Sequence, residues 1–447
     1  MVGQRPHGFA PDLVLLRCAR WAFFHSCPSL TPWAKIRGMK DFQLYQQILG
    51  LVAPWRVESV SLKTKEQEIE VRVGFADTLW GCPQCQKRME IHDYEERRWR
   101  HLDSCQFKTI ILSRVPMVRC AEHGAQTVAV PWAEKYSRFS RLFERRAIDV
   151  MLECSISGAC AILNLSWDAA DGIKQRAVKR GLARKTPAVM ERLCVDEKGM
   201  GHGQNYLTIV AQVRADRTTV EYVGEERQRE SLDAFWESLT AEQLTGIEAV
   251  AMDMWEPYVE STLSHVPGAV GKIVPDPFHL VKYMNEAVND VRKNEHRRLL
   301  AQGDDILKNT RQLWLYGMEK VPAQHAQRFE EVKALNLQTS RAWGIKEVFR
   351  SFWLCPGVQS AERYFDKWYG WAIRSRLDPI KKVARMCQAH LGNILTFFVH
   401  RLTNGPIEGL NNKIQGLIKK AYGYRSKARF KTDIFFHLGG LNLYPAQ

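Results

Sequence analysis

NGPIEGLNNKIQGLIKKAYGYR, residues 404–425, begins with an Asn-Gly-Pro turn and continues as an amphipathic helix. Its apolar residues recur every three or four positions, as on the buried face of a helix: Ile407, Leu410, Ile414, Leu417 and Ile418. Glu408 lies in the first turn, where the positive end of the helix dipole favours an anion. Amides, cations and aromatic residues occupy the other face and the end of the stretch: Asn411, Asn412, Lys413, Gln415, Lys419, Lys420, Tyr422, Tyr424 and Arg425. This pattern suits metal-dependent chemistry on a phosphate backbone, whereas a solvated helix cap is the simpler interpretation of Glu408 alone.

Two aspartates upstream follow apolar strands of one predicted sheet. Leu193–Val195 precedes Asp196, and Ile247–Met252 precedes Asp253. The remaining patterns give the order βββαβαβα, with strands at 206–213, 218–223 and 272–274 and helices at 231–239, 255–263 and from about 278. This is the order of an RNase H-like fold, in which the first and fourth strands are neighbours. We therefore expect Asp196 and Asp253 to lie side by side at one edge of the sheet.

Asp196, Asp253 and Glu408 together form a set of three carboxylates. Three anions held close together repel one another unless divalent cations neutralise them. Oxygen ligands suit Mg²⁺ or Mn²⁺ better than zinc, and two such ions can clamp the attacking and leaving oxygens of a phosphoryl transfer. The set predicts metal-dependent chemistry on a phosphodiester without a covalent intermediate on the protein. A structural role for each strand-end Asp alone is the alternative.

A long helical segment separates Asp253 from Glu408. Residues 299–400 have a mostly helical pattern and contain large aromatic residues: Trp314, Trp343, Phe349, Trp353, Trp368 and Trp371. The segment is too long for a simple connection between a strand and a helix. It predicts an inserted helical unit, with most of these aromatic residues in its core.

Two short motifs nearer the N-terminus predict a zinc site. Cys82 and Cys85 form a C-x2-C motif, and Cys120 and His123 follow a predicted strand at 109–118. Such knuckles at hairpin tips supply four ligands for tetrahedral zinc. Another half-buried strand is predicted within residues 59–73, where polar and apolar residues alternate. Cys105 is an alternative ligand, and unligated cysteines of a cytosolic protein are the alternative to a metal site.

Residues 139–182 predict three short helices, the second and third capped by Ser155 and Ser166. We expect the third helix to enter the major groove of DNA with four cations facing outward: Lys174, Arg176, Lys179 and Arg180. A plain three-helix bundle with a solvated basic face is the alternative. Four more cations expected to contact DNA follow Glu408: Lys413, Lys419, Lys420 and Arg425.

The composition is that of a basic globular protein. The 447 residues carry a formal net charge of +15, which favours a polyanionic partner, with nucleic acid ahead of membrane. No apolar run approaches the roughly 18 residues of a membrane span. Eleven mostly scattered cysteines fit a reducing cytosol better than a disulfide framework. The apolar run near residues 17–30 is too short and too interrupted by charge for an export signal.

The stretch at 404–425 resembles the C-terminal catalytic motif of the ISL3-family insertion-sequence transposases, which are DDE enzymes with an RNase H-like fold. The resemblance extends over most of the chain from about Met39. It implies three catalytic, metal-binding carboxylates, Asp196, Asp253 and Glu408, and a zinc ribbon that holds Cys82, Cys85, Cys120 and His123.

A further match relates Asp276-Pro-Phe-His279 to the D-x2-H element of related transposases. It implies that His279 contacts a phosphate or orients a water molecule. A helix-start histidine with structural partners is the alternative. Because family members begin near Met39, residues 1–38 are interpreted as an upstream extension that is poorly ordered.

These observations predict a multidomain protein of the α+β or α/β class. The expected parts are the extension at 1–38, a zinc-ribbon-like domain at 39–135, a helix–turn–helix domain at 136–187, and an RNase H-like core at 188–298 and 401–447 interrupted by a helical insertion at 299–400. The expected activity is that of a cytoplasmic bacterial DNA transposase that binds the terminal inverted repeats of its element and target DNA as a dimer or higher oligomer. It would use catalytic Mg²⁺ or Mn²⁺ and structural Zn²⁺. A catalytically silent DNA-binding regulator and an RNase H-like nuclease are the alternatives.

Overall fold

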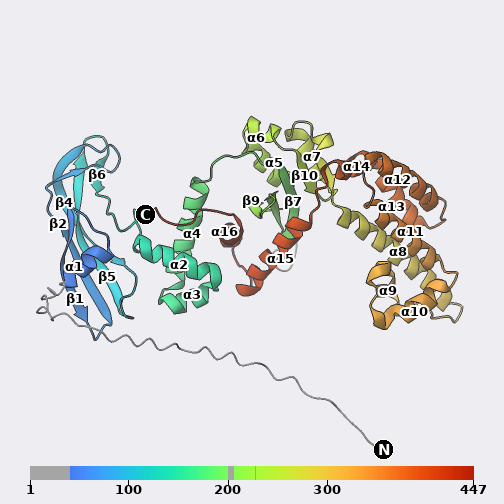
Figure 1. Cartoon of the computed structure of the whole chain (residues 1–447), viewed down its shortest axis with the longest axis horizontal. Helices are drawn as coiled ribbons and strands as arrows, with labels where there is room; N and C mark the ends of the chain where they lie inside the picture. The colour runs from blue at the N-terminus through green and yellow to red at the C-terminus, as the bar shows by residue number, and fades with distance from the viewer. Residues whose placement is uncertain (1–40, 200–205, 227, 447) are drawn as a thin grey trace, which may run out of the picture.

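The computed structural model describes residues 41–199, 206–226 and 228–446. Figure 1 shows an elongated molecule with a β-rich unit at one end, a small helical bundle beside it, a five-stranded sheet in the middle and a larger helical unit at the far end. The extension expected at residues 1–38 lies outside the described residues.

The N-terminal unit is a sheet in the order β1-β2-β5-β4-β3, with β6 paired to β5. It follows a short helix, α1, and its elements are α1 (Asp41–Ile48), β1 (Trp55–Lys63), β2 (Glu68–Phe75), β3 (Leu79–Gly81), β4 (Arg88–Arg100), β5 (Lys108–Cys120) and β6 (Gly124–Thr127). The strand predicted at 109–118 lies within β5. The single strand predicted at 59–73 is wrong, because β1 and β2 form an antiparallel hairpin whose turn falls at residues 64–67. The all-polar run at residues 63–68 interrupts the alternation of polar and apolar residues at this turn.

Three helices follow, as predicted: α2 (Arg141–Glu153), α3 (Ile156–Leu163) and α4 (Trp167–Ala183). Serine side chains cap all three by accepting a hydrogen bond from the backbone N–H three residues on: Ser140, Ser155 and Ser166. Such caps satisfy amide groups that the first helical turn leaves without partners. The two predicted caps, Ser155 and Ser166, are confirmed.

The central sheet has the order β11-β10-β7-β8-β9. Its strands are β7 (Arg192–Gly199), β8 (Tyr206–Val213), β9 (Thr218–Gly224), β10 (Ala249–Met252) and β11 (Ile273–Pro275). The predicted neighbours, the first and fourth strands, are β7 and β10, and they pair in parallel. One expectation is corrected: the first strand does not end before Asp196 but continues to Gly199, because its second half pairs with β8.

Helices cover both faces of this sheet. One face packs against α5 (Arg229–Glu237) and α7 (Glu256–His265), with the short α6 (Ala241–Thr245) beside them. The other face packs against α15 (Gly405–Lys420) and α16 (Lys427–Leu438), which return from the end of the chain. Residues of β10 alternate between these two layers: Val250 and Met252 contact the first, and Ala249 and Ala251 the second.

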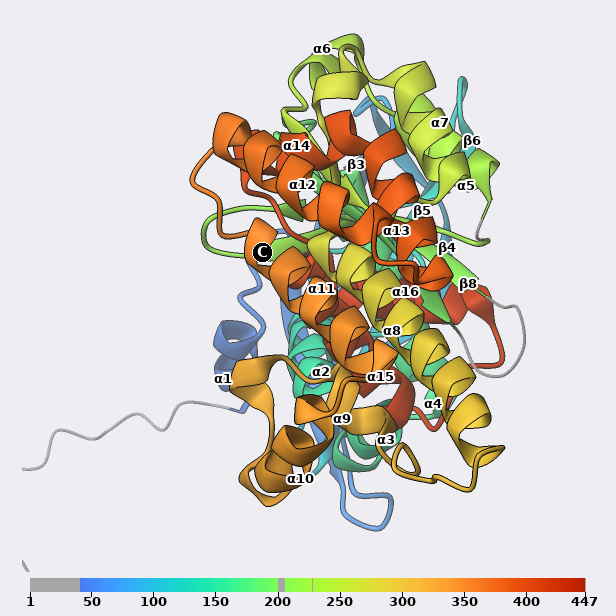
Figure 2. The ribbon, with the colours of Figure 1, turned by 90° about the vertical axis from the view of Figure 1, so that its right-hand side faces the viewer.

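The larger helical unit lies between β11 and α15. It consists of α8 (Pro277–Leu300), α9 (Arg311–Leu315), α10 (Ala323–Ala334), α11 (Gln338–Phe352), α12 (Val358–Ile373), α13 (Asp378–Ala389) and α14 (Leu391–His400). Helix α8 packs against α11 and α13, as the end-on view shows (Figure 2). Helix α14 returns to the sheet, where the Thr396 hydroxyl donates to the Ile273 carbonyl at 2.6 Å. None of the described helices is both long enough and apolar enough to cross a membrane.

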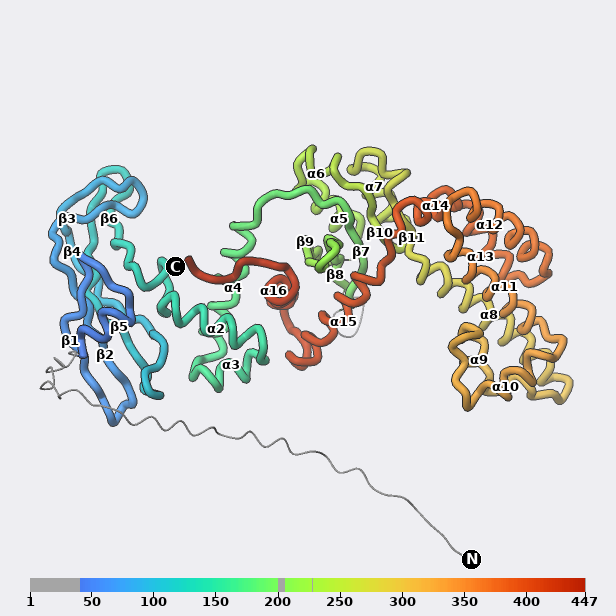
Figure 3. Tube along the Cα trace, in the orientation of Figure 1, coloured from blue at the N-terminus to red at the C-terminus, as the bar shows by residue number. Residues whose placement is uncertain are grey.

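The C-terminal end of the chain joins the layer of α15 and α16 to the bundle of α2, α3 and α4. Figure 3 shows α16 and the tail beyond it lying beside α4 and α2. The Tyr444 hydroxyl donates to Asp149 on α2 at 2.7 Å, and its carbonyl accepts a hydrogen bond from Arg184 at 2.6 Å. The predicted domain boundaries stay a prediction, and α8 crosses the boundary expected near residue 298 without a break.

Candidate active site

Asp196 and Asp253 lie at the same level of two adjacent parallel strands. Cys194 on β7 is the register partner of Ala251 on β10, and each aspartate comes two residues after its member of that pair. Side chains two residues apart point to the same face of a sheet. Cys194 and Ala251 both belong to the apolar layer beneath α15 and α16. The expectation that the two carboxylates lie side by side is therefore supported by the strand register.

Helix α15 lies against this end of β7 and contacts Asp196 directly. The Asn411 side-chain amide donates a 2.6 Å hydrogen bond from Nδ2 to Asp196 Oδ2. Glu408 precedes Asn411 by three residues, so both side chains lie on the same side of the helix. Glu408 is exposed, and among the described residues no hydrogen bond or ion pair links its carboxylate to another side chain. Just before the helix, the Thr403 carbonyl lies 3.7 Å from the Cys194 thiol.

A third aspartate extends the row of acids to the next strand. Met252 on β10 pairs with Pro275 on β11, and Asp253 and Asp276 each follow directly. Asp276 is buried and caps α8. Its Oδ2 lies 3.0 Å from His279 Nδ1, and His279 Nε2 lies 3.9 Å from Asp253 Oδ2. His279 therefore has structural partners and at the same time borders the carboxylates.

The electrostatics of this row favour a cation. Burial raises the pKa of Asp196, and the negative charges of Asp276 and Asp253 add to this rise, while the Glu197 backbone N–H and the nearby His279 oppose it. The hydrogen bond to Asp276 raises the pKa of His279. Burial, followed by the charges of Asp276 and Asp196, raises the pKa of the Cys194 thiol to about 12, so this group is neutral. His279 and Lys198 supply positive charge near Asp196, and a divalent ion would neutralise the remaining negative charge of the row.

Amide groups at the start of α15 have unused hydrogen-bonding capacity. Within the described residues, Asn404 is buried with neither Oδ1 nor Nδ2 paired, and Asn411 Oδ1 is buried and unpaired as well. A buried polar group without a partner costs about 1–3 kcal/mol, so these atoms call for water or a ligand. Carboxylate and amide oxygens are the donors that Mg²⁺ and Mn²⁺ accept. The residues present therefore fit such an ion.

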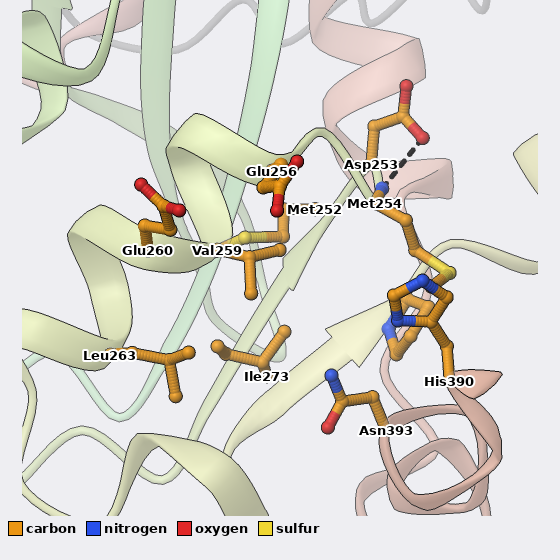
Figure 4. Close-up of a pocket in the computed structure, with 11 residues that line it drawn as sticks. Met252, Asp253, Met254, Glu256, Val259, Glu260, Leu263, Ile273, His390 and Asn393 are labelled. Carbon is orange, nitrogen blue, oxygen red and sulfur yellow. Dashed lines mark hydrogen bonds between the residues drawn. The ribbon is translucent and has the colours of Figure 1, made fainter.

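A cavity of about 300 Å³ borders Asp253 on the opposite side. Val259 and Leu263 of α7 and Asn393 of α14 line it, and Figure 4 shows the Asp253 carboxylate pointing away from them. That carboxylate accepts a 2.7 Å hydrogen bond from the Met254 backbone N–H. The cavity is consequently separate from the place where the carboxylates and α15 meet.

The four predicted zinc ligands come together at the tip of the N-terminal sheet. Their donor atoms lie within 4.8 Å of one another: Cys82, Cys85, Cys120 and His123. Cys85 Sγ lies 3.7 Å from Cys120 Sγ, and Cys120 Sγ lies 3.5 Å from His123 Nδ1. In a tetrahedron with zinc–sulfur bonds of 2.3 Å, neighbouring sulfur atoms lie about 3.8 Å apart. The observed separations match this spacing. Hydrogen bonds from the Glu122 backbone and then from His123 lower the pKa of Cys120 to about 6. The donor set fits a structural zinc ion, and the exposed Cys105 is not part of it.

The basic face predicted on α4 is largely wrong. Lys174 is buried and pairs with Asp433 of α16 at 2.6 Å. Arg176 and Arg180 both bind the buried Glu144 of α2, at 2.5 and 3.0 Å. These three cations therefore hold α4 to its neighbours: Lys174 and Arg180 are covered by α2, α16 and the C-terminal tail, and the Arg176 side chain is 33% exposed. Lys179 alone of the four is exposed.

The cations predicted on and after α15 have the expected exposure. All four are exposed to solvent: Lys413, Lys419, Lys420 and Arg425. Lys420 Nζ also donates to the Glu153 carbonyl of α2 at 3.0 Å, which joins the end of α15 to the helical bundle.

Asn411 is the site residue that the predictions from sequence missed. The sequence places Asn411 among the amides on the polar face of the helix but does not indicate which residue it bonds. The available signal was its spacing of three residues from Glu408, which puts both on one side of an α-helix. The identity of its partner, Asp196, depends on how α15 packs against β7.

Comparisons with known proteins agree with this arrangement. A transposase model of the ISL3 type matches residues 193–434, more than half of the chain. The zinc-finger of transposase IS204/IS1001/IS1096/IS1165 matches residues 78–123, and the helix-turn-helix domain of transposase family ISL3 matches residues 128–178. The predicted fold class, with zinc ribbon, helix–turn–helix and RNase H-like core, is confirmed.

Curated relatives cover most of the chain. The transposase for insertion sequence element IS1001 of Bordetella parapertussis is 26% identical over 360 residues, which span 79% of this chain and 87% of that protein. The transposase for insertion sequence element IS1557 of Mycobacterium tuberculosis is 24% identical over 421 residues, which span 87% and 93%. From the family models and these relatives, the chain belongs to the ISL3 family of insertion-sequence transposases.

Proposed function

We propose that the protein is a DDE transposase that binds the terminal inverted repeats of its insertion sequence and catalyses metal-dependent cleavage and strand transfer. One observation carries this proposal. Asp196 and Asp253 lie at the same level of adjacent parallel strands, on the face that α15 covers with Asn411 bonded to Asp196 and Glu408 one turn earlier.

The residues that would hold the catalytic metal are Asp196, Asp253 and Glu408. Divalent ions bound there would neutralise the carboxylates and stabilise the charge that develops on the attacking and leaving oxygens of the phosphodiester. Asn411 restrains Asp196 in one orientation through its 2.6 Å hydrogen bond. An ordered carboxylate needs less rearrangement when the substrate binds, which favours the transition state.

His279 has a positioning and charge-compensating role in this proposal. Asp276 holds its Nδ1 side at 3.0 Å, which leaves Nε2 directed toward Asp253 at 3.9 Å. The hydrogen bond to Asp276 raises the pKa of His279, and a protonated ring would donate from Nε2 to a phosphate oxygen near Asp253. Asp276 acts through His279 and caps α8.

The N-terminal units would recognise DNA. A zinc ion at Cys82, Cys85, Cys120 and His123 would hold the two knuckles of the ribbon together, because metal binding in such small units is coupled to folding. In the helix–turn–helix bundle, the exposed Gln175 and Lys179 of α4 are the candidates for DNA contact. The exposed cations of α15 would contact the phosphates of the strand that is cut.

The variant Glu408→Gln tests the proposal. Gln keeps the length of the side chain but removes a charge that holds metal, so strand transfer should fall by several orders of magnitude, at about 1.4 kcal/mol per tenfold. Binding to terminal repeats in a gel shift should be unchanged, because the helix–turn–helix and ribbon units are intact. Strand transfer with Mg²⁺ and the gel shift should be measured on the same preparation.

Glu256→Gln is the matched control, since Glu256 also lies in the first turn of a helix and follows Asp253 by three residues. It should leave both readouts unchanged. Transfer by Glu408→Gln at the wild-type rate would remove Glu408 from the site. A DNA-binding regulator would instead show no transfer even with the wild-type chain.

A further inference from the structure

A second cleft lies at the opposite end of α15 from Glu408. It has a volume of about 560 Å³ and lies between the helical bundle and the turn that joins α15 to α16. Figures 1 and 3 show this turn returning toward α3. Twelve residues separate Glu408 from Lys420, or about 18 Å along the helix axis, which is about five nucleotides at the duplex rise. The cleft is thus distinct from the carboxylate site but within reach of the same DNA strand.

One wall of the cleft is a flat stack of an arginine and a tryptophan. The Arg429 guanidinium lies 4.4 Å from the centre of the Trp167 ring, and Arg429 Nε lies 3.3 Å from Asp171. Trp167 is the first residue of α4 and is 39% exposed. A guanidinium fixed in this way offers its own flat face for stacking, as aromatic rings do.

The turn contributes a second aromatic ring. Tyr422 lines the cleft and is 100% exposed. Its φ of 54° is in the left-handed region, which a non-glycine residue adopts rarely, and Gly423 follows with φ of 97°. A fully exposed aromatic side chain on such a turn gains nothing from packing within the chain. It is well suited to packing against a ligand.

The charge of the cleft is positive. Its two acids are already paired, Asp171 with Arg429 and Asp433 with Lys174. Lys420 and Arg425 are exposed at its rim and are not neutralised by these acids. Aromatic rings together with cations are the combination that binds single-stranded nucleic acid, with bases stacked on the rings and phosphates beside the cations. In a duplex the faces of the bases are covered by their neighbours, so stacking surfaces select unpaired bases.

We propose that this cleft binds unpaired nucleotides of the DNA end, with one base stacked on Tyr422, another on the Trp167–Arg429 pair, and phosphates held by Lys420 and Arg425. The inference rests on the proposed function in one respect: the strand is supplied by the DNA that the carboxylate site cuts. Its binding chemistry is independent of catalysis and can be measured without divalent metal.

The experiment uses the full-length protein with a fluorescein-labelled single strand of about twelve nucleotides, within the usual site size, in the presence of EDTA. Fluorescence anisotropy gives its affinity. Tyr422→Ala should weaken binding by about 5- to 150-fold, the range expected for loss of one stacked base. Because Tyr422 is fully exposed, its loss should leave the melting temperature unchanged. Tyr136→Ala is the control, since Tyr136 is also 78% exposed but lies outside the cleft, and it should have no effect.

A second pair of probes separates unpaired from paired DNA. Wild-type protein should prefer a terminal-repeat duplex with a few unpaired end nucleotides over the fully paired duplex, and Tyr422→Ala should abolish that preference. Unchanged single-strand affinity in Tyr422→Ala, or an equal loss on paired and unpaired ends, would overturn the proposal. The two proposals fail separately. Glu408→Gln should keep single-strand binding while it loses strand transfer, and Tyr422→Ala should leave the gel shift on fully paired repeats intact.

Discussion

Helices α4 and α15 look alike in the sequence and differ in the folded chain. Each is amphipathic and carries several cations toward its C-terminal half. On α4, Lys174, Arg176 and Arg180 turn inward and pair with acids. On α15, Lys413, Lys419 and Lys420 are exposed. A row of cations on a helix therefore does not by itself identify a DNA-binding face.

The difference depends on what packs against each helix. Helix α4 is enclosed by α2, α16 and the C-terminal tail, and two of its arginines bind the buried Glu144. The apolar face of α15 covers the central sheet, which leaves its other side to solvent. Cations that pair with buried acids stabilise the fold, whereas exposed cations are available for phosphates and contribute little to stability.

The largest effect that this comparison predicts is on stability, at Glu144. The Glu144 carboxylate is 1% exposed and binds Arg176, Arg180 and the Ser137 hydroxyl. Glu144→Ala leaves two partly buried guanidinium groups without their partner, and breaking such a buried pair costs about 3–5 kcal/mol. Urea unfolding should show this loss, with Glu153→Ala at the end of the same helix as a near-neutral control. A variant as stable as wild type would mean that α4 does not depend on these pairs.

An intermediate effect is predicted on DNA affinity at α15. The double variant Lys413→Ala and Lys419→Ala removes two exposed cations, so the slope of log affinity against log salt should fall by about two. Its urea midpoint should stay within error of wild type. The salt dependence of a gel shift or anisotropy titration checks this prediction. If the double variant kept the salt slope and lost stability, the α15 cations would have the structural role that is assigned here to the α4 cations.

The smallest effect is predicted at Lys179, the one exposed cation of the four on α4. Lys179→Ala should lower the salt slope by about one if it contacts a phosphate, with no change in stability. Lys174→Met should do the opposite: it should lower stability, because Asp433 loses its ion-pair partner, and leave the salt slope alone. Two variants on one helix thus separate a DNA contact from a structural ion pair. If Lys179→Ala and Lys174→Met changed the salt slope equally, exposure in the free protein would not predict which cation contacts DNA.

Much of the fold and part of the site could be predicted from the sequence. Alternating and helical periodicity located the strands and helices of the central unit, and their order identified β7 and β10 as neighbours. The C-x2-C and C-x2-H spacings identified the four side chains that come together at the candidate zinc site, and Ser155 and Ser166 identified two helix starts. These features are local, because periodicity, caps and knuckles are properties of a few consecutive residues.

Only the tertiary structure decided the features that join distant segments. The hydrogen bond of Asn411 to Asp196 joins residues far apart in the chain, and the pair of Lys174 with Asp433 does the same. Lys174 is buried because it pairs with Asp433 of α16, more than two hundred residues later, whereas Arg176 and Arg180 pair with Glu144 of α2. Burial changes the free energy of a charge by several kcal/mol, and burial depends on which segments pack together. The sequence alone therefore determined where charges and carboxylates occur along the chain, while tertiary packing decided which of them are paired and which remain available to DNA and metal.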